Sequence, residues 1–227
     1  MSEIAENIRR LKEKLPDNVK LVAVSKTKTI EDIMEAYRAG QRNFGENRVQ
    51  ELMDKYKHVP GDIRWHMIGH LQRNKVKYIA GFIHLIESVD SEKLLREINK
   101  EGNKAGRTID CLLQFHIARE ETKFGFSIEE AVEMIKSGIT EELKNVNIRG
   151  VMGMATFTED MDRVRSEFVF LRSVFEELKE NFCREKDDFC EISMGMSGDY
   201  RVALEEGSTM IRIGTAIFGA RYCKIDN

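Results

Sequence analysis

Apolar residues recur in two patterns along the chain. Short runs rich in Val, Ile, Leu, Met and Phe alternate with longer polar segments in which apolar residues return every three or four positions. The first pattern is typical of buried strands and the second of amphipathic helices, so their alternation predicts a parallel sheet with crossover helices. Eight strands are predicted, in LVAVS (21–25), NFG (43–45), IRWHMIG (63–69), HLIESV (84–89), IDCLLQFHI (109–117), IRGVMGMA (148–155), FCEISMG (189–195) and MIRIGTAIFG (210–219).

Helix starts are predicted between these strands by capping residues. Thr29 and Ser91 each precede a polar segment, and Ser127 with Glu130 has the spacing of a capping box. An amphipathic helix, and not a signal peptide, is predicted before the first strand, because apolar residues recur at helical spacing up to Pro16. These residues are Ile4, Ile8, Leu11 and Leu15.

Eight strands, each followed by a helix, predict an α/β fold of the (β/α)8 or TIM-barrel type with an additional N-terminal helix. An open doubly wound sheet is the alternative that the pattern leaves. The chain has 227 residues, only two prolines and no Ser/Gly-rich linker. We therefore expect residues 1–227 to form a single domain, whose active site would lie at the carboxyl ends of the strands.

Composition narrows the class of protein. The 36 Lys and Arg residues nearly balance 39 Asp and Glu residues, and no segment concentrates basic charge. This excludes an extended nucleic-acid groove or a basic membrane-binding surface. No apolar stretch approaches the roughly 20 residues of a membrane span, and the four cysteines are far apart, which predicts free thiols. We expect a cytoplasmic protein.

One lysine occupies a position suited to chemistry. Lys26 follows the first predicted strand and shares a face with Val22 and Val24, whereas Leu21 and Ala23 share the other. Position alone leaves two interpretations open. Either Lys26 marks the exit of the strand into water, or it is a partly buried amine whose pKa falls enough to form a Schiff base with a carbonyl.

Glycine-rich turns follow the last two strands. The first contains Gly195, Ser197 and Gly198 and leads into a helix predicted to begin near Asp199; the second contains Gly214 and Thr215. Such turns present backbone N–H groups to anions. In barrels of this type, the loops after the seventh and eighth strands often bind a phosphate group.

Arg212 lies inside the apolar eighth strand, where a charged residue requires a partner. Two interpretations remain: an ion pair with a glutamate such as Glu191, or a fixed donor to a planar ligand. His66 and His70 are four residues apart, but that spacing forms a metal site on a helix and not on a strand with its loop. We therefore predict no metal site.

Several motifs together carry a family resemblance. They are AVSKTK (23–28), FGENRVQE (44–51), WHMIGHLQRNK (65–75), ESVDS (87–91), KFGFS (123–127), ISMGMSGDY (192–200) and GSTMIRIGTAIFGAR (207–221). In this order they resemble the YggS/PROSC family of pyridoxal phosphate (PLP) homeostasis proteins, whose fold is similar to the N-terminal barrel of alanine racemase.

The resemblance implies a cofactor and the residues that hold it. Lys26 would carry pyridoxal 5′-phosphate as an internal aldimine, a Schiff base, and Asn47 would lie near the ring substituents. Arg212 would face the pyridine nitrogen. Ser197, Gly214 and Thr215 would hold the phosphate, and Met196 and Gly195 would line the pocket.

The same resemblance implies a role in PLP homeostasis, and indirectly in amino-acid balance, without efficient catalysis and hence without a catalytic residue. Alanine racemase draws a tyrosine acid/base from a C-terminal domain, whereas only six residues follow Arg221 here. PLP-dependent apo-enzymes would be the recipients, and we expect a monomer. Thr156 departs from the family pattern, where many relatives have proline. Whether Lys28 or Lys123 offers a second PLP contact stays open.

Two alternatives belong to other classes. A PLP-dependent amino-acid racemase of low efficiency would share the barrel, the lysine and the arginine. A cofactor-free Schiff-base aldolase would use the same lysine on a sugar phosphate, and would be colourless.

Overall fold

Parallel strands form a closed barrel in the computed structural model, which describes residues 2–118, 124–182 and 187–219. Each strand pairs with the next one along the chain, and β1 closes the ring by pairing with β8, where Val22 lies opposite Arg212. The strands are β1 (Lys20–Val24), β2 (Asn43–Glu46), β3 (Arg64–Met67), β4 (Leu85–Val89), β5 (Ile109–Phe115), β6 (Val146–Gly153), β7 (Glu191–Ser193) and β8 (Met210–Ile213). The barrel prediction is confirmed, and the open-sheet alternative is wrong.

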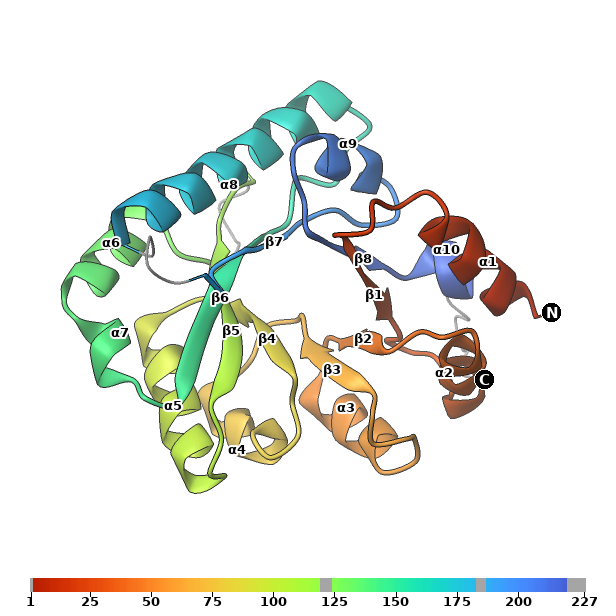
Figure 1. The fold of residues 1–227 in the computed structure, drawn as a ribbon, viewed down its shortest axis with the longest axis horizontal. Coiled ribbons are helices and arrows are strands. Elements are labelled where there is room, and N and C mark those ends of the chain that lie inside the picture. The colour runs from red at the N-terminus through yellow and green to blue at the C-terminus, as the bar shows by residue number, and fades with distance from the viewer. Residues whose placement is uncertain (1, 119–123, 183–186, 220–227) are drawn as a thin grey trace, which may run out of the picture.

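Helices surround the barrel on its outside (Figure 1). They are α1 (Glu3–Lys12), α2 (Ile30–Arg38), α3 (Val49–Tyr56), α4 (Val76–Ile79), α5 (Glu92–Lys104), α6 (Ile128–Lys136), α7 (Ile139–Glu142), α8 (Met161–Phe182), α9 (Tyr200–Glu205) and α10 (Thr215–Phe218), with a 3-10 turn η1 (Arg73–Lys75) before α4. The additional helix α1 packs beside α10, where the Asn7 side chain donates to the carbonyl of Ile217 at 3.1 Å.

The predicted caps begin the helices for which they were expected. Thr29 and Asp32 form a capping box at α2, Ser127 and Glu130 form another at α6, and the Ser91 hydroxyl caps α5. Several predicted strand ends differ from the observed ones by one or two residues, and the largest difference is in the eighth strand. The segment 215–218 was assigned to the eighth strand but forms α10, because Gly214 ends the strand and a helical turn follows.

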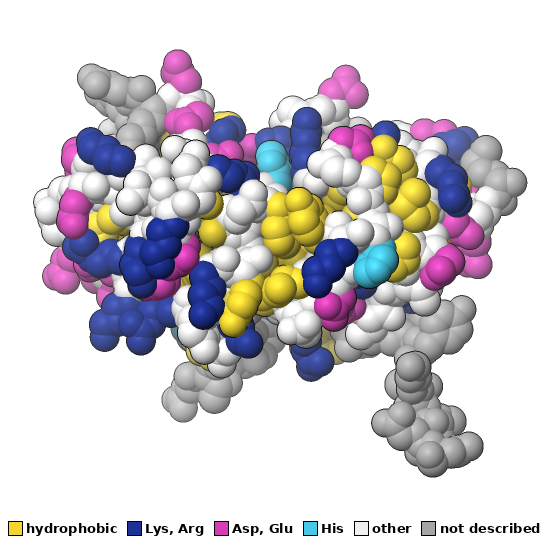
Figure 2. All heavy atoms as spheres, turned by 90° about the horizontal axis from the view of Figure 1, so that it is seen from below, with side chains coloured by type: hydrophobic (Ala, Val, Ile, Leu, Met, Phe, Trp, Pro, Cys, Tyr) yellow, Lys and Arg dark blue, Asp and Glu magenta, His cyan; other side chains and the backbone are white. Residues whose placement is uncertain are grey.

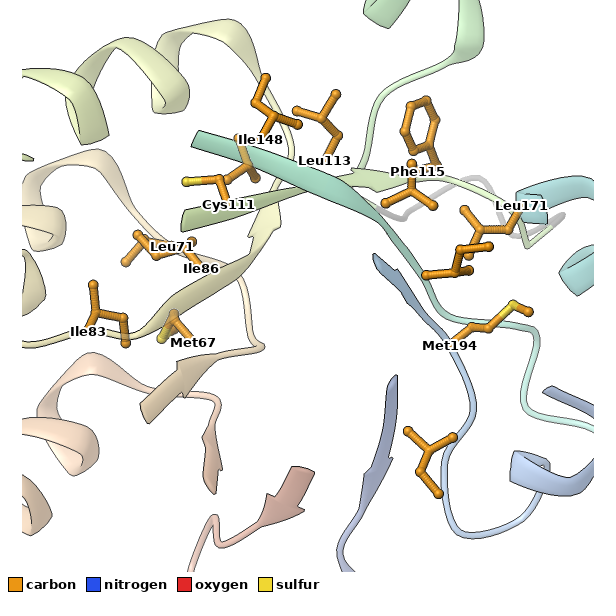
Figure 3. Packing of buried hydrophobic residues seen from close by; sticks show 14 of the residues in the cluster. Met67, Leu71, Ile83, Ile86, Cys111, Leu113, Phe115, Ile148, Leu171 and Met194 are labelled. Atoms are coloured by element: carbon orange, nitrogen blue, oxygen red, sulfur yellow. The ribbon is translucent and has the colours of Figure 1, made fainter. Parts of the chain in front are cut away.

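Apolar side chains pack in two layers. The outer layer lies between the strands and the helices and includes Leu21 and Ala23. Figure 3 shows other members of this layer, among them Ile86, Cys111 and Leu113. The inner layer fills the barrel lumen and consists of Val22, Leu85, Leu112, Met152 and Met210. The period-two alternation predicted for the first strand is therefore confirmed for residues 21–23.

A bulge interrupts β6. Cys111 of β5 lies opposite Ile148 and Leu112 lies opposite Gly150, so Arg149 is an extra residue. Gly150 has a φ of 150°, and a Cβ atom there would lie 1.9 Å from the carbonyl oxygen of Glu191. Only glycine fits this position.

The surface carries charges of both signs. Figure 2 shows the molecule from below the view of Figure 1. On this face, basic and acidic side chains are interspersed around a central group of apolar side chains. Exposed aromatic residues include Tyr56 of α3 and Tyr78 of α4. Within the described ranges, no helix is both long and apolar enough to cross a membrane.

Candidate functional site

The predicted site residues gather at the carboxyl ends of four neighbouring strands. Because β1 pairs with both β8 and β2, and β8 also pairs with β7, the loops after these strands meet at one rim of the barrel. The residues there are Lys26 after β1, Asn47 after β2, Met196 and Ser197 after β7, Arg212 in β8, and Gly214 and Thr215 after it.

Arg212 is buried, with 4% of its surface exposed. Its Nη1 donates to the Ser193 hydroxyl at 2.5 Å and its Nη2 donates to the Gly153 carbonyl at 2.9 Å. Ser193 in turn donates to Glu87 at 2.6 Å, and this carboxylate lies 3.7 Å from the guanidinium. Arg212 is therefore fixed inside the barrel wall by its neighbours before any ligand arrives.

The partner of Arg212 differs from the one considered from the sequence. Glu191 pairs with Lys20 at the amino-terminal end of the barrel, whereas Arg212 projects toward the other end and uses Glu87. The sequence carries a signal for Glu87, since an acid inside the apolar run LIESV requires a partner as much as an arginine does. The sequence alone does not show which acidic residue pairs with Arg212.

The buried polar chain continues from Glu87 to His66. The Nδ1 atom of His66 lies 2.7 Å from Glu87 Oε1. Burial opposes ionisation of Glu87, but the hydrogen bond from His66 and the charges of His66 and Arg212 hold its pKa below the ordinary value. His66 also lines a cavity of about 280 Å³ at the amino-terminal end of the barrel. Side chains of β3, β4, β7 and β8 thus form one polar connection through the lumen.

The glycine-rich turn after β7 has a fixed shape. Gly195 has a φ of 95°, and a Cβ atom there would lie 2.6 Å from the Cβ of Ala203, so glycine is required. The Met196 N–H donates to the Asp199 carboxylate at 2.5 Å, and α9 begins at the next residue. The Met196 N–H is thus already used, and the donors left for an anion in this turn begin at Ser197.

The second glycine-rich turn begins α10. Gly214 lies against Val24 of β1, and its carbonyl accepts from Ile217 and Phe218. The first N–H groups of a helix have no acceptor within the helix. The Thr215 hydroxyl and the N–H groups beside it are therefore suited to an anion at the rim.

Asn47 is held by a close backbone contact. A Cβ atom on Gly69 would lie 2.5 Å from the Asn47 carbonyl oxygen, so the loop after β3 supports the loop after β2 only because residue 69 is glycine. This contact gives the glycine of the WHMIGH motif a structural role that the sequence did not reveal.

Lys26 lies in a turn between β1 and α2, and the residue is partly buried. The Ser25 hydroxyl donates to Glu46 at 2.6 Å, which ties the turn to β2. Lys28 is buried and donates to the Phe218 carbonyl at 2.9 Å, at the end of α10. Lys28 thus packs the turn against α10, whereas Lys123 lies outside the described residues.

The donor set can be compared with the needs of PLP. The ligand has an aldehyde, a phosphate group and an aromatic nitrogen; the rim offers an amine, hydroxyl and N–H donors, and a guanidinium. A guanidinium has five N–H donors, and the described contacts of Arg212 use two. The residues present fit this ligand class.

The two histidines that were considered as a metal pair have separate partners. His66 is buried against Glu87, and His70 bonds to Asp90 at 2.9 Å in a recess of about 610 Å³ beside β3 and β4. Among the residues that the structure describes, no group of three His, Cys, Asp or Glu is arranged to hold a metal ion.

A closed parallel barrel with a lysine after β1 and a glycine-rich turn after β8 is the arrangement expected of an alanine racemase-like barrel. The family model described as "Alanine racemase, N-terminal domain" matches residues 1–222. Pyridoxal phosphate homeostasis proteins of Pasteurella multocida and Aquifex aeolicus are 38% and 39% identical, each aligned over 97% of this chain and 96% of the relative. The chain belongs to the family of pyridoxal phosphate homeostasis proteins, as the motifs indicated.

A solved structure agrees with this assignment. PipY of Synechococcus elongatus PCC7942, determined with PLP bound, is 35% identical and superposes with a TM-score of 0.86 over 95% of this chain and 100% of that one.

Proposed function

We propose that the chain binds pyridoxal 5′-phosphate covalently through Lys26 and serves PLP homeostasis in the cytoplasm, as a monomer that supplies PLP-dependent apo-enzymes. The observation that carries the proposal is the convergence of Lys26, Arg212 and the two glycine-rich turns on one barrel rim, in a chain similar over its length to PLP homeostasis proteins. PLP, when bound, supplies an aldehyde that reacts with amines and a ring that withdraws electrons.

Each residue has a separate part in holding the cofactor. Lys26 provides the amine, while Ser197, Gly214 and Thr215 provide donors for the phosphate. Asn47 and Met196 border the ring, and Gly195 allows the turn beside it. Because these groups come from four strands, orientation of the ligand depends on the barrel and not on one flexible loop.

The chemistry of Arg212 favours a protein that binds PLP over one that uses PLP to convert a substrate. An arginine only donates and stays protonated, so a ring nitrogen facing it remains an unprotonated acceptor. The contacts to Ser193 and Gly153 fix the guanidinium, and its remaining N–H groups can donate to that nitrogen without transferring a proton. This makes the ring a weaker electron sink, which supports a carrier without efficient catalysis.

The assignment of Lys26 is tested on the purified protein. We expect the protein to be yellow, and borohydride to bleach the colour and label the peptide that contains Lys26. Lys26→Ala and Lys26→Arg should lose the colour and the label, because neither side chain forms a bond with the aldehyde. The control is Lys14→Ala, at an exposed position. A label at full yield in Lys26→Arg would contradict the assignment, and a colourless wild type would favour the aldolase alternative.

The racemase alternative is tested by isotope exchange. In heavy water, we expect the PLP-loaded protein to exchange the α-proton of alanine far more slowly than about 1 per second, the lower end of usual enzyme turnover. Nuclear magnetic resonance follows the loss of the α-proton signal. Exchange at or above that rate would overturn the carrier proposal while leaving the Lys26 assignment intact.

A further inference from the structure

The turn that carries Lys26 contains an unusual backbone conformation. Thr27 has a φ of 65°, and within the described ranges it is the one residue other than glycine with a positive φ. Threonine is branched at Cβ, and such residues are strongly disfavoured in the left-handed region. The turn therefore requires contacts that hold it.

Glu51 and Lys55 of α3 provide these contacts. The Thr27 N–H donates to Glu51 Oε1 at 2.6 Å, and the same oxygen accepts from Lys55 Nζ at 2.6 Å. Lys55 also donates to the Ser25 carbonyl at 2.7 Å and to Glu46 at 2.8 Å. All three ammonium donors are used. The Glu51–Lys55 pair thus binds the backbone on both sides of Lys26.

Both Glu46 and Glu51 lie within ion-pair distance of Lys55, at 2.8 Å and 2.6 Å. Lys55 is buried, with 6% of its surface exposed, so its charge needs a partner. Burial raises the pKa of Glu46, because its desolvation outweighs the attraction of Lys55. Glu51 lies nearer the surface and connects this charge to the Thr27 backbone.

The turn is also fixed on its other side. Lys28 donates to the Phe218 carbonyl, and α10 begins three residues earlier in the chain, at the glycine-rich turn of Gly214 and Thr215. Contacts from α3 and to α10 together set the position of the Lys26 backbone relative to Gly214 and Thr215.

We propose that Glu51 and Lys55 are positioning residues of the cofactor site, which hold the strained turn so that the Lys26 amine meets the aldehyde of a ligand anchored by its phosphate. This inference rests on the proposed function. A pair that only docked α3 onto the barrel would need no contact with Ser25 or Thr27.

The test separates positioning from ligand anchoring. In Glu51→Ala, the bond between Lys26 and PLP should form about tenfold to a hundredfold more slowly, as expected when a reacting group is displaced by about an ångström. Stopped-flow absorption measures this rate. Pyridoxine 5′-phosphate, which has no aldehyde, should bind with an affinity within about twofold of wild type, since its phosphate contacts are intact. Asp54→Ala, on the same helix, is the control.

A second substitution, which removes the backbone strain at residue 27, should restore the rate of bond formation. Glycine adopts a positive φ without the cost that threonine has, so Thr27→Gly in the Glu51→Ala background should recover much of the lost rate. Glu51→Gln keeps an acceptor for the Thr27 N–H and should lie between wild type and Glu51→Ala; it serves in place of Glu51→Ala if that variant does not fold.

Several outcomes would overturn the inference. These are a wild-type rate in Glu51→Ala, an equal loss of affinity for pyridoxine 5′-phosphate, or no recovery on adding Thr27→Gly. Failure of the wild-type protein to form the bond at all would instead refute the proposed function.

Discussion

At the scale of single residues, two opposite charges buried in strands of the barrel depend on each other. Arg212 and Glu87 each lie in an apolar strand, and each is buried with the other as partner. Removal of one member of such a pair typically costs about 3–5 kcal/mol, because the other charge stays buried. The sequence showed that Arg212 needed a partner; the choice of Glu87 over Glu191 depends on barrel geometry, which spacing along the chain does not encode.

His84 provides a test of electrostatics at the opposite end of the barrel. Desolvation lowers its pKa to about 4, assisted by the positive charges of His66, Arg64, Lys20 and Arg149. An unfolded histidine titrates near 6.5. Between these values the unfolded chain binds a proton that the folded chain does not, so stability should be complete above about pH 6.5 and fall as the pH approaches 4.

The measurement is a titration of the His84 ring by nuclear magnetic resonance, combined with urea unfolding at several pH values. His84→Asn should flatten the pH dependence between pH 7 and 4, although by a small amount because His84 is exposed and solvent screens its charge. Titration of His84 at an ordinary value would contradict the expectation.

At the scale of elements, the connection between β6 and α8 accounts for a departure from the family pattern. Thr156, where many relatives were expected to have proline, donates its N–H to Glu167 Oε2 at 2.7 Å and its hydroxyl to Oε1 at 2.8 Å. Arg163 contacts both residues. Proline has no N–H, so threonine here secures the first turns of α8 to the end of β6.

Replacement of Thr156 should destabilise the fold. Thr156→Val loses the hydrogen bonds of the hydroxyl with Glu167 and Arg163, which corresponds to about 1–3 kcal/mol, and Thr156→Pro should lose more because the N–H bond to Glu167 disappears as well. The free energy of unfolding in urea measures the effect, with Glu159→Gln at an exposed position as control. Equal stability of Thr156→Pro and wild type would show that the contacts to Glu167 do not stabilise the fold.

At the scale of the whole molecule, the barrel could be predicted because most strands lie in short apolar runs and several of the helices between them begin at recognisable caps. The rim position of Lys26 followed from the same pattern. The contacts of Glu51 and Lys55 could not be predicted, since α3 reads as an ordinary polar helix and its contact with the turn 25–28 depends on the tertiary fold. The end of β8 was also missed, because TAIF has the composition of a strand while Gly214 directs it into a helix.

The bulge at Arg149 and Gly150 reverses the alternation of inward-facing and outward-facing side chains along β6. Counting by twos from Ile148, which faces the helices, would direct Met152 to the same side; the inserted residue turns Val151 to the helices and Met152 into the lumen. Deletion of either bulge residue would restore simple alternation along this strand. The side chains that follow in β6 would then exchange the lumen for the helix-facing side, although their own sequence had not changed.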